Sequence, residues 1–408
     1  MTLDILFQMV VSALWALAIF AGVANLAGLC TWVERKLSSM IQDRIGPNRA
    51  NVRLFGTNIT AIGLLHPIAD AVKMFMKEDF VPAGANRVLH TLAPMICLFI
   101  PFVVFCVVPF VGPLHIQWKD IPASDIWLIG SLFPGDVLHL SDYTLYFMVA
   151  DLDMGMLYVF GIASLGVYGV LLAGYSSNNK FSFLGALRAA NQMIGYEVAL
   201  GLTAVGVFMV YGSLSLNTIV EQQGKLLWGV IPLWGIFTQF PAFLLFVACG
   251  MAEIKKIPFD LPEGESEIIA GYFLEYSSLK FTMFLFAEYV EMILLSALIT
   301  TLFFGGWQIP WIDGEGYRFW HWAGPWAGTW LAQTFGLNGL RILIALLQGL
   351  KFTVFLCVWI YLLFMIRWTF PRVRYDQLMK IGWKMILPLA LLNIVATGAF
   401  LAVWRGWI

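Results

Sequence analysis

Charged residues are scarce in this chain: Asp, Glu, Lys and Arg make up 12% of its 408 residues. Hydrophobic residues make up 60%, and the mean hydropathy is +0.81. An ordinary soluble domain has an apolar fraction nearer to one half. The composition therefore excludes a soluble globular domain and indicates a membrane protein with several spans.

Cysteine and histidine are also few. The five cysteines lie singly in apolar runs without a CxxC spacing, whereas iron–sulfur clusters and structural zinc need clustered thiolates. We interpret them as small buried hydrophobic side chains. The five histidines fall in loops or at the ends of apolar runs, whereas a transmembrane haem needs axial ligands within the helices. We therefore expect no metal or redox centre in this chain.

Basic residues are missing from the N-terminal flank of the first apolar run. Asp4 lies before the run, and Arg35 and Lys36 follow it. A secretory signal peptide has the opposite order of charge. We therefore expect this run to remain as a membrane span.

Eight apolar runs are long enough to cross a membrane as helices, which takes about 18 residues or more. They cover about residues 5–33, 94–114, 144–174, 193–212, 231–252, 282–304, 342–366 and 385–404. We therefore expect an all-α polytopic membrane protein in which residues 1–408 form a single membrane domain. The loops on one side contain 18 Lys and Arg, and those on the other side contain 5. The positive-inside rule then places both termini outside and the loop at 253–281 inside.

A basic segment, ERKLSSMIQDRIGPNRANVR at residues 34–53, follows the first span. It is either an interfacial loop that touches anionic lipid or a ring of cations around a cavity that receives an amphiphile. Next, His66, Asp70, Lys73 and Lys77 share one face of a helical pattern over residues 62–77. We expect an amphipathic helix in the membrane plane, and contact with water alone would explain its polar face.

The densest charge lies in residues 252–276, AEIKKIPFDLPEGESEIIAGYFLEY, which carry six carboxylates and two lysines. A charge at the centre of a bilayer costs about 2.5–3.5 kcal/mol, so charges cluster there only where a function or a partner holds them. Asp260-Leu-Pro-Glu263 predicts a helix start, after which Glu263 and Glu267 would share one face. Either a cation neutralises these two acids or one of them holds a proton. Both outcomes suit a loop that handles protons.

Three further acids lie within the expected spans. Glu197 is about one turn inside the fourth span, where it is either desolvated or reaches back to the inner interface. Glu288 and Glu291 share one face of the sixth span, so they must face a polar interior or be neutral. Lys351, near mid-depth in the seventh span, is a candidate partner for an inward-facing carboxylate.

Six long blocks of the sequence carry a family resemblance. They are ERKLSSMIQDRIGPNR (34–49), HPIADAVKMFMKED (66–79), SLGVYGVLLAGYSSNNKFSFLGALRAANQMIGYEVALG (164–201), PFDLPEGESEIIAGYFLEYSSLKF (258–281), FAEYVEMILLSALITTLFFGGW (286–307) and PRVRYDQLMKIGWKMILPLALLN (371–393). They closely resemble the quinone-site membrane subunit of respiratory complex I, known as the H subunit of bacterial NADH-quinone oxidoreductase and as NADH dehydrogenase subunit 1 in mitochondria. The blocks cover most of the membrane portion in order, and blocks of this length are highly specific.

The resemblance implies an eight-helix subunit that joins a hydrophilic redox arm to a proton-pumping membrane arm. Such a subunit shapes much of the tunnel through which quinone enters from the lipid. Acidic positions of the water-filled path from the quinone cavity to the pump modules are matched by Glu197, Glu253, Glu263, Glu265, Glu267 and Glu288. Basic positions near the quinone mouth are matched by Arg35 and Arg44, and an acid of the amphipathic helix is matched by Asp70.

The same resemblance implies the partners and the cofactors. Quinone is the expected substrate, and FMN and iron–sulfur clusters are expected in partner subunits. The expected partners are the other subunits of a respiratory complex and membrane lipids, with no nucleic acid. A bacterial inner membrane is favoured over a mitochondrial or thylakoid membrane.

The chain departs from the family pattern in two ways. Where relatives usually read AETNRAPFD, it reads AEIKKIPFD, so Lys256 stands at the usual arginine. Because lysine lacks the planar two-pronged donor of arginine, a carboxylate contact at this point is in doubt. The chain is also longer than most members, in the expected external loops around 115–143, 212–230 and 305–341.

Two other functions remain open from the sequence. One is the equivalent subunit of a membrane-bound hydrogenase or of another dehydrogenase. The other is a self-contained ion or metabolite transporter, for which an inverted repeat with broken helices would be expected, and no internal repeat is visible.

Overall fold

The computed structural model describes residues 3–50, 52–54, 57–59, 61–116, 121–122, 137–138, 143–227, 231–310, 312–313, 316–317 and 326–405. The long helices are α1 (Leu3–Ile41), α3 (Arg87–Val104), α6 (Lys180–Tyr211), α11 (Ser278–Phe303), α13 (Trp326–Thr369) and α15 (Leu387–Arg405). The shorter α-helices are α2 (His66–Met76), α4 (Gly155–Ala163), α5 (Gly166–Ser176), α7 (Leu216–Gln223), α8 (Gly235–Thr238), α9 (Phe240–Glu253), α10 (Glu265–Ile268) and α14 (Tyr375–Lys380).

Short turns of helix and small hairpins complete the described chain. The 3-10 turns are η1 (Ala61–Gly63), η2 (Phe105–Val107) and η4 (Gly271–Phe273), and η5 (Ile381–Ile386) is a π-helical turn that joins α14 to α15. The antiparallel strand pairs are β1 (Val52–Leu54) with β2 (Thr57–Ile59), β3 (Leu114–Ile116) with β6 (Tyr143–Leu145), β4 (Ile121–Pro122) with β5 (Val137–Leu138), β7 (Leu226–Leu227) with β8 (Ile231–Pro232), and β9 (Ile312–Asp313) with β10 (Gly316–Tyr317).

Seven helical segments within the described residues are long and apolar enough to cross a membrane. The expected all-α membrane protein is therefore confirmed, but the expected number of eight spans is not. At the fifth expected span, residues 231–252, the chain forms α8 and then α9, an apolar helix of 14 residues. Pro241 opens α9, because proline lacks the N–H that would continue the preceding helix. A helix of this length is about 21 Å long, against a hydrocarbon core of about 30 Å.

Two other expected spans have different bounds in the structure. The third is divided at Ser164 and Leu165 into α4 and α5. The fourth begins earlier than the apolar run, because the Asn179 side chain accepts a hydrogen bond from the Phe181 N–H and caps α6 there. A helix is present within 62–77 as α2, which has no buried residue, and its position in the membrane plane stays a prediction.

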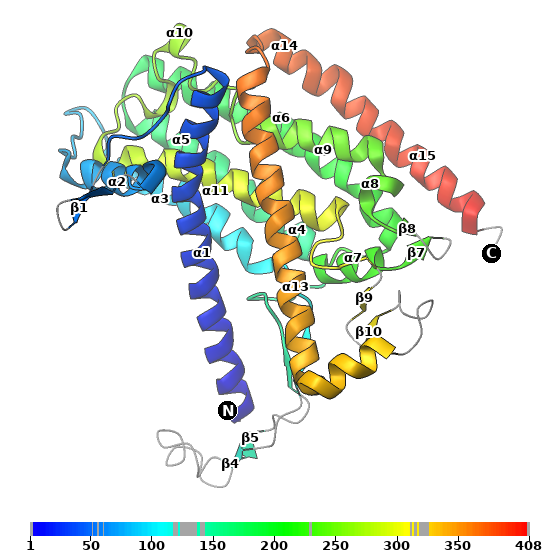
Figure 1. Ribbon diagram of the computed structural model, residues 1–408. Coiled ribbons are helices and arrows are strands. Elements are labelled where there is room, and N and C mark those ends of the chain that lie inside the picture. The colour runs from blue at the N-terminus through cyan, green and yellow to red at the C-terminus, as the bar shows by residue number, and fades with distance from the viewer. Residues whose placement is uncertain are drawn as a thin grey trace.

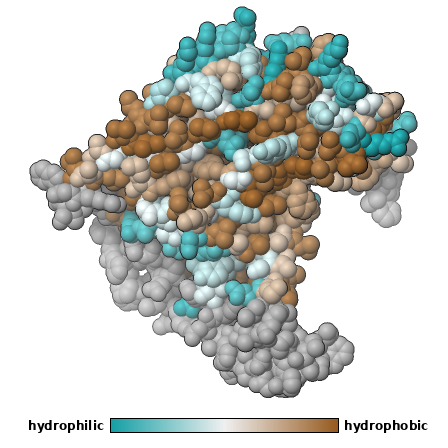
Figure 2. Space-filling view, turned by 180° about the vertical axis from the view of Figure 1, so that it is seen from behind, coloured by the Kyte–Doolittle hydropathy of each residue, from teal (hydrophilic) through white to brown (hydrophobic). Residues whose placement is uncertain are grey.

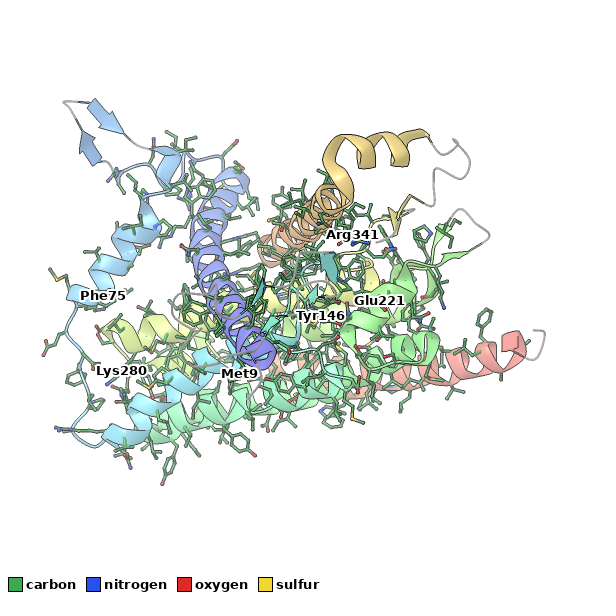
Figure 3. The ribbon with its side chains drawn as sticks, turned by 90° about the horizontal axis from the view of Figure 1, so that it is seen from below. Met9, Phe75, Tyr146, Glu221, Lys280 and Arg341 are labelled. Atoms are coloured by element: carbon green, nitrogen blue, oxygen red, sulfur yellow. The ribbon has the colours of Figure 1, made fainter. Side chains whose placement is uncertain are left out.

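The helices surround α11 (Figure 1). In α11, 67% of the apolar window is buried inside the molecule, compared with 6% in α1. In Figure 1, α1 and α13 run from top to bottom, whereas α6, α9 and α15 run obliquely beside them. Seen from behind, a broad hydrophobic band is topped by hydrophilic side chains (Figure 2). Seen from below, Phe75 of α2 points away from the bundle, in agreement with its 69% exposure (Figure 3).

Candidate functional site

The acidic loop, defined here as residues 254–277 between α9 and α11, folds back into the molecule. Lys255 has a φ of 62° and Gly271 a φ of 64°, so the chain reverses direction just after α9 and again before α11. A Cβ at Gly271 would lie 1.7 Å from the Pro262 carbonyl oxygen, which only glycine permits. The expected helix start at Asp260–Glu263 is wrong: Leu261 to Glu263 form a turn, and α10 begins at Glu265.

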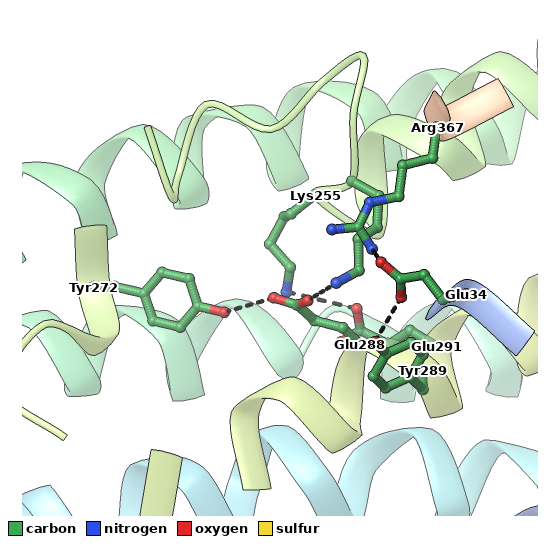
Figure 4. A network of polar contacts seen from close by, with 8 residues as sticks. Glu34, Lys255, Tyr272, Glu288, Tyr289, Glu291 and Arg367 are labelled. Carbon is green, nitrogen blue, oxygen red and sulfur yellow. Dashed lines mark hydrogen bonds and ion pairs between the residues drawn. The ribbon is translucent and has the colours of Figure 1, made fainter. Parts of the chain in front are cut away.

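Glu288 of α11 is the centre of a buried network of charges (Figure 4). Its side chain is 1% exposed and forms an ion pair with Lys256 from the acidic loop. Tyr272 donates a hydrogen bond to Glu288 Oε1 at 3.3 Å. The lysine at the usual arginine position therefore does contact a carboxylate, as a single donor.

Glu291, one turn further along α11, has its own cation. Lys255 Nζ lies 3.5 Å from Glu291 Oε2, and the Lys255 side chain is 3% exposed. The sequence predicted that Glu288 and Glu291 face a polar interior or are neutral, and in the structure each faces a buried lysine. The partner expected for an inward-facing carboxylate was Lys351, and that expectation is wrong. Lys351 Nζ donates instead to the carbonyl oxygens of Phe304 and Gly306, at 2.6 and 2.7 Å.

A third acid, Glu34, joins the network from the end of α1. Arg367 of α13 forms an ion pair with Glu34 Oε1, and Tyr289 of α11 donates to Glu34 Oε2 at 2.6 Å. Lys256 Nζ lies 5.2 Å from the centre of the Tyr289 ring, so a cation–π contact connects this group to Glu288. Sequence reasoning did not select Glu34, although its place between a span and Arg35 was a signal.

Asp260 and Glu263 lie on the acidic loop above this network. Burial raises the pKa of Asp260 to about 6, against the opposing charge of Arg372. Burial, followed by the negative charge of Glu288, raises the pKa of Glu263 to about 8. Both carboxyl groups therefore hold a proton to higher pH than exposed acids do.

Glu263 and Glu267 do not share a helix face, which corrects the sequence-based expectation. Glu267 is exposed and forms an ion pair of 2.7 Å with Arg188 of α6. The turn before Gly264 separates the two acids. One of the two outcomes expected for this pair, neutralisation by a cation, applies to Glu267. The raised pKa of Glu263 favours the other outcome, a held proton.

Glu253, at the end of α9, lines an internal cavity of about 60 Å³ together with Glu291. The rest of the wall is mostly aliphatic and comes from α3, α4, α5, α6, α9 and α11. A cavity of this size has room for several water molecules. Glu197 of α6 is partly buried and lies within electrostatic reach of Glu253.

The basic segment, which begins in the last turns of α1, contacts α2. Arg35 and Asp70 form an ion pair of 2.5 Å, and Lys73 lies 3.3 Å from the same carboxylate. Arg44 is apart from this pair and donates from Nε to Gln42 at 2.7 Å. The structure therefore brings Arg35 together with Asp70, whereas Arg44 lies apart from them.

A family model described as NADH dehydrogenase matches residues 14–398 of the chain. The chain belongs to this family. It is 39% identical over 388 residues to the NADH-quinone oxidoreductase H subunit of Flavobacterium psychrophilum, with 95% of this chain and 96% of the relative covered. It is 40% identical over 394 residues to the corresponding H subunit of Thermomicrobium roseum, with 96% of each chain covered.

The six acids matched to the NADH dehydrogenase family pattern lie in different surroundings. Glu288, Glu263 and Glu253 lie in or beside the buried network, whereas Glu197 borders it and Glu267 is exposed on an ion pair. The sixth, Glu265, begins α10, and its side chain lies outside the described residues. Within the described residues, no three His, Cys, Asp or Glu side chains gather to form a metal site. The expected external loop at 115–143 falls largely outside the described residues, and in the loop at 305–341 residues 311, 314–315 and 318–325 fall outside them.

Proposed function

We propose that this chain is the membrane subunit of a proton-pumping NADH:quinone oxidoreductase, in which it forms the quinone-access cavity and relays protons through buried carboxylates. The observation that supports the proposal is the continuous polar core of an otherwise apolar bundle. This core runs from Glu34 through Glu288 and Glu291 to the Glu253 cavity. Membership of the NADH dehydrogenase family supplies the reaction.

The cost of this core is the physical argument for a function. Each ion within the membrane costs about 2.5–3.5 kcal/mol, and a buried ion pair is often no more stable than apolar side chains of similar size. The helical bundle could therefore be built without Glu288 or Lys256. Buried charged groups are kept at such a cost where they must exchange protons.

We place the quinone headgroup beside Arg35, Asp70 and Glu34, where the basic segment and α2 lie next to the network. FMN and iron–sulfur clusters of partner subunits would supply two electrons taken from NADH. Quinone then becomes hydroquinone by accepting these two electrons and two protons. Withdrawing these protons from groups near Glu34 leaves negative charge there and changes the field at Arg367. This change passes through the Tyr289 and Lys256 contacts to Glu288.

The energies are sufficient for coupling. Moving one charge against a potential of 100 mV costs about 2.3 kcal/mol, and one unit of pKa corresponds to about 1.4 kcal/mol. A change of about two pKa units along the relay therefore balances the transfer of one proton across such a potential. We further propose that the complex resides in a bacterial inner membrane and contains both a hydrophilic arm and a pump arm.

The test uses the assembled complex in membrane vesicles. Glu288→Gln and Glu197→Gln keep side-chain size and remove the proton-carrying group, so we expect coupled quinone reduction and proton uptake to fall by roughly 10²-fold. Reduction of an artificial acceptor by the hydrophilic arm should be unchanged. Glu221→Gln removes the same group from an exposed position on α7 and should leave both activities intact. Full coupled turnover in both relay variants would show that the assignment is wrong.

A further inference from the structure

Lys255 and Glu291 form a buried pair that the family pattern does not provide for. Lys255 stands where the pattern AETNRAPFD has asparagine, so this chain places an extra cation next to Lys256. The pair lies inside a membrane bundle, with Lys255 3% and Glu291 20% exposed. Adding two charges to an apolar core is costly unless both are used, which makes this pair the least explained feature of the network.

The pair lies between two groups that the proposed relay must connect. On one side, Glu288 is one helical turn away on the same face of α11. On the other side, Glu291 and Glu253 line the same cavity of about 60 Å³. Within the described residues, no other acid lines that cavity.

The local geometry of Glu291 leaves room for water. Its Oε2 atom is buried, and its partner within the described part of the chain is Lys255 Nζ at the long distance of 3.5 Å. A buried carboxylate oxygen with only a distant donor loses several kcal/mol of hydration unless water reaches it. The cavity beside it is large enough to hold that water.

We propose that Glu291 is a proton-carrying residue that links Glu288 to Glu253 through water in this cavity, and that Lys255 is the residue that positions it. The proposal rests on the proposed function and adds a step to it. A protonated Glu291 gives its proton to cavity water, and the water gives a proton to the Glu253 carboxylate. One proton moves, no electron is transferred, and Lys255 remains an ammonium ion that holds Glu291 in place.

The decisive experiment compares a single with a double substitution in the assembled complex. Glu291→Gln removes the carboxyl group and leaves Lys255 unpaired, whereas Lys255→Met/Glu291→Gln removes both charges together. If the pair only supports the fold, the double variant recovers activity, because no unpaired charge remains. If Glu291 carries protons, the double variant stays impaired, since the carboxyl group is still missing.

We expect coupled quinone reduction in both variants to be lower by on the order of tenfold or more, with artificial-acceptor reduction unchanged. Lys255→Arg keeps a cation and should retain most of the rate, whereas Lys255→Met should not. A double variant with more than half of the parent rate would overturn the inference, even if Glu291→Gln alone fails to assemble. Full rate in Glu291→Gln would also overturn it.

The same series separates this inference from the proposed function. Glu288→Gln serves as the reference for the relay itself. If Glu288→Gln loses coupled quinone reduction while Glu291→Gln keeps full activity, only the step through Glu291 is refuted. If both variants keep full activity, the proposed carboxylate relay as a whole is refuted.

Discussion

At the scale of single residues, three buried acids of the network each face a cation, whereas Glu263 does not. Glu34 faces Arg367, Glu288 faces Lys256 and Glu291 faces Lys255. No cation forms a described ion pair with Glu263, and its pKa is raised to about 8 by burial and by Glu288. This carboxyl group is therefore expected to change its charge near pH 8.

The raised pKa of Glu263 leads to a prediction about pH. Below about pH 8 this group is protonated and can give a proton to the network, and above that pH it is an anion that repels Glu288. We expect coupled quinone reduction to decline as the pH rises through about 8. In Glu263→Gln this alkaline decline should be absent and the rate at neutral pH lower, by about tenfold. A pH profile of kcat on vesicles measures both effects.

Glu267→Gln is the matched control for this experiment. Glu267 lies on the same loop but is exposed and paired with Arg188, so its substitution should leave the alkaline limb unchanged. If coupled quinone reduction in Glu263→Gln still declines as the pH rises through about 8, a group other than Glu263 causes the decline.

The sequence predicted the acids of the site better than their partners. Glu288 and Glu291 could be selected because two charges on one face of an apolar helix need compensation. Their lysines could not be assigned, because the φ of 62° at Lys255 turns the loop back onto α11, and local sequence does not reveal such a turn. The position of Lys351 near mid-depth in its span suggested it as a partner for an inward-facing carboxylate. In the structure Lys351 instead donates to backbone carbonyl groups just after α11.

At the scale of elements, the acidic loop is held against α6 by a contact between two glycines. A Cβ at Gly185 of α6 would lie 2.7 Å from Gly271 Cα and 2.8 Å from the Tyr272 nitrogen. Both atoms belong to backbone, which cannot rotate away. The position of Tyr272, and with it the hydrogen bond to Glu288, therefore depends on Gly185 having no side chain.

We expect Gly185→Ala to displace the loop, at a cost of roughly 1–3 kcal/mol for an overpacked contact. Coupled quinone reduction should fall and the loop should become more susceptible to protease. Gly201→Ala is the matched control in the same helix, since nothing lies within 4 Å of its added Cβ. Normal activity and protease resistance in Gly185→Ala would show that the loop is not held in this way.

The helices themselves were largely predictable, and their ends were not. Apolar length located α1, α3, α11 and α13, because a span must bury its backbone polar groups in a helix. It failed at α9, where Pro241 and the non-helical Gln239 interrupt an apolar run. It also misplaced the start of α6, because residues 180–192 continue the helix beyond the apolar run on the side of the acidic loop.

At the scale of the whole molecule, polar groups and apolar surface are divided between its interior and its rim. The buried charges gather around α11, whereas α1 and α15 expose leucine and valine side chains such as Leu17 at 69% and Val395 at 72%. Surfaces of this kind suit lipid or the helices of neighbouring subunits. The bundle therefore presents apolar faces to the membrane while it encloses its own charges.

The orientation of this bundle in the membrane is the last prediction. The excess of Lys and Arg places the acidic loop and α14 inside, and α7 outside. Asp376 of α14 and Glu221 of α7 are both exposed, and Figure 3 shows Glu221 near the face seen from below. A membrane-impermeant thiol reagent added to intact cells should label Glu221→Cys and should label Asp376→Cys only after lysis.

The parent chain measures the background, because its cysteines lie in apolar helices and in η2. The opposite labelling pattern would place the acidic loop outside. A loop on that side could not meet subunits that take electrons from NADH within the cell. The orientation experiment therefore bears on the proposed reaction as directly as any substitution within the charge network.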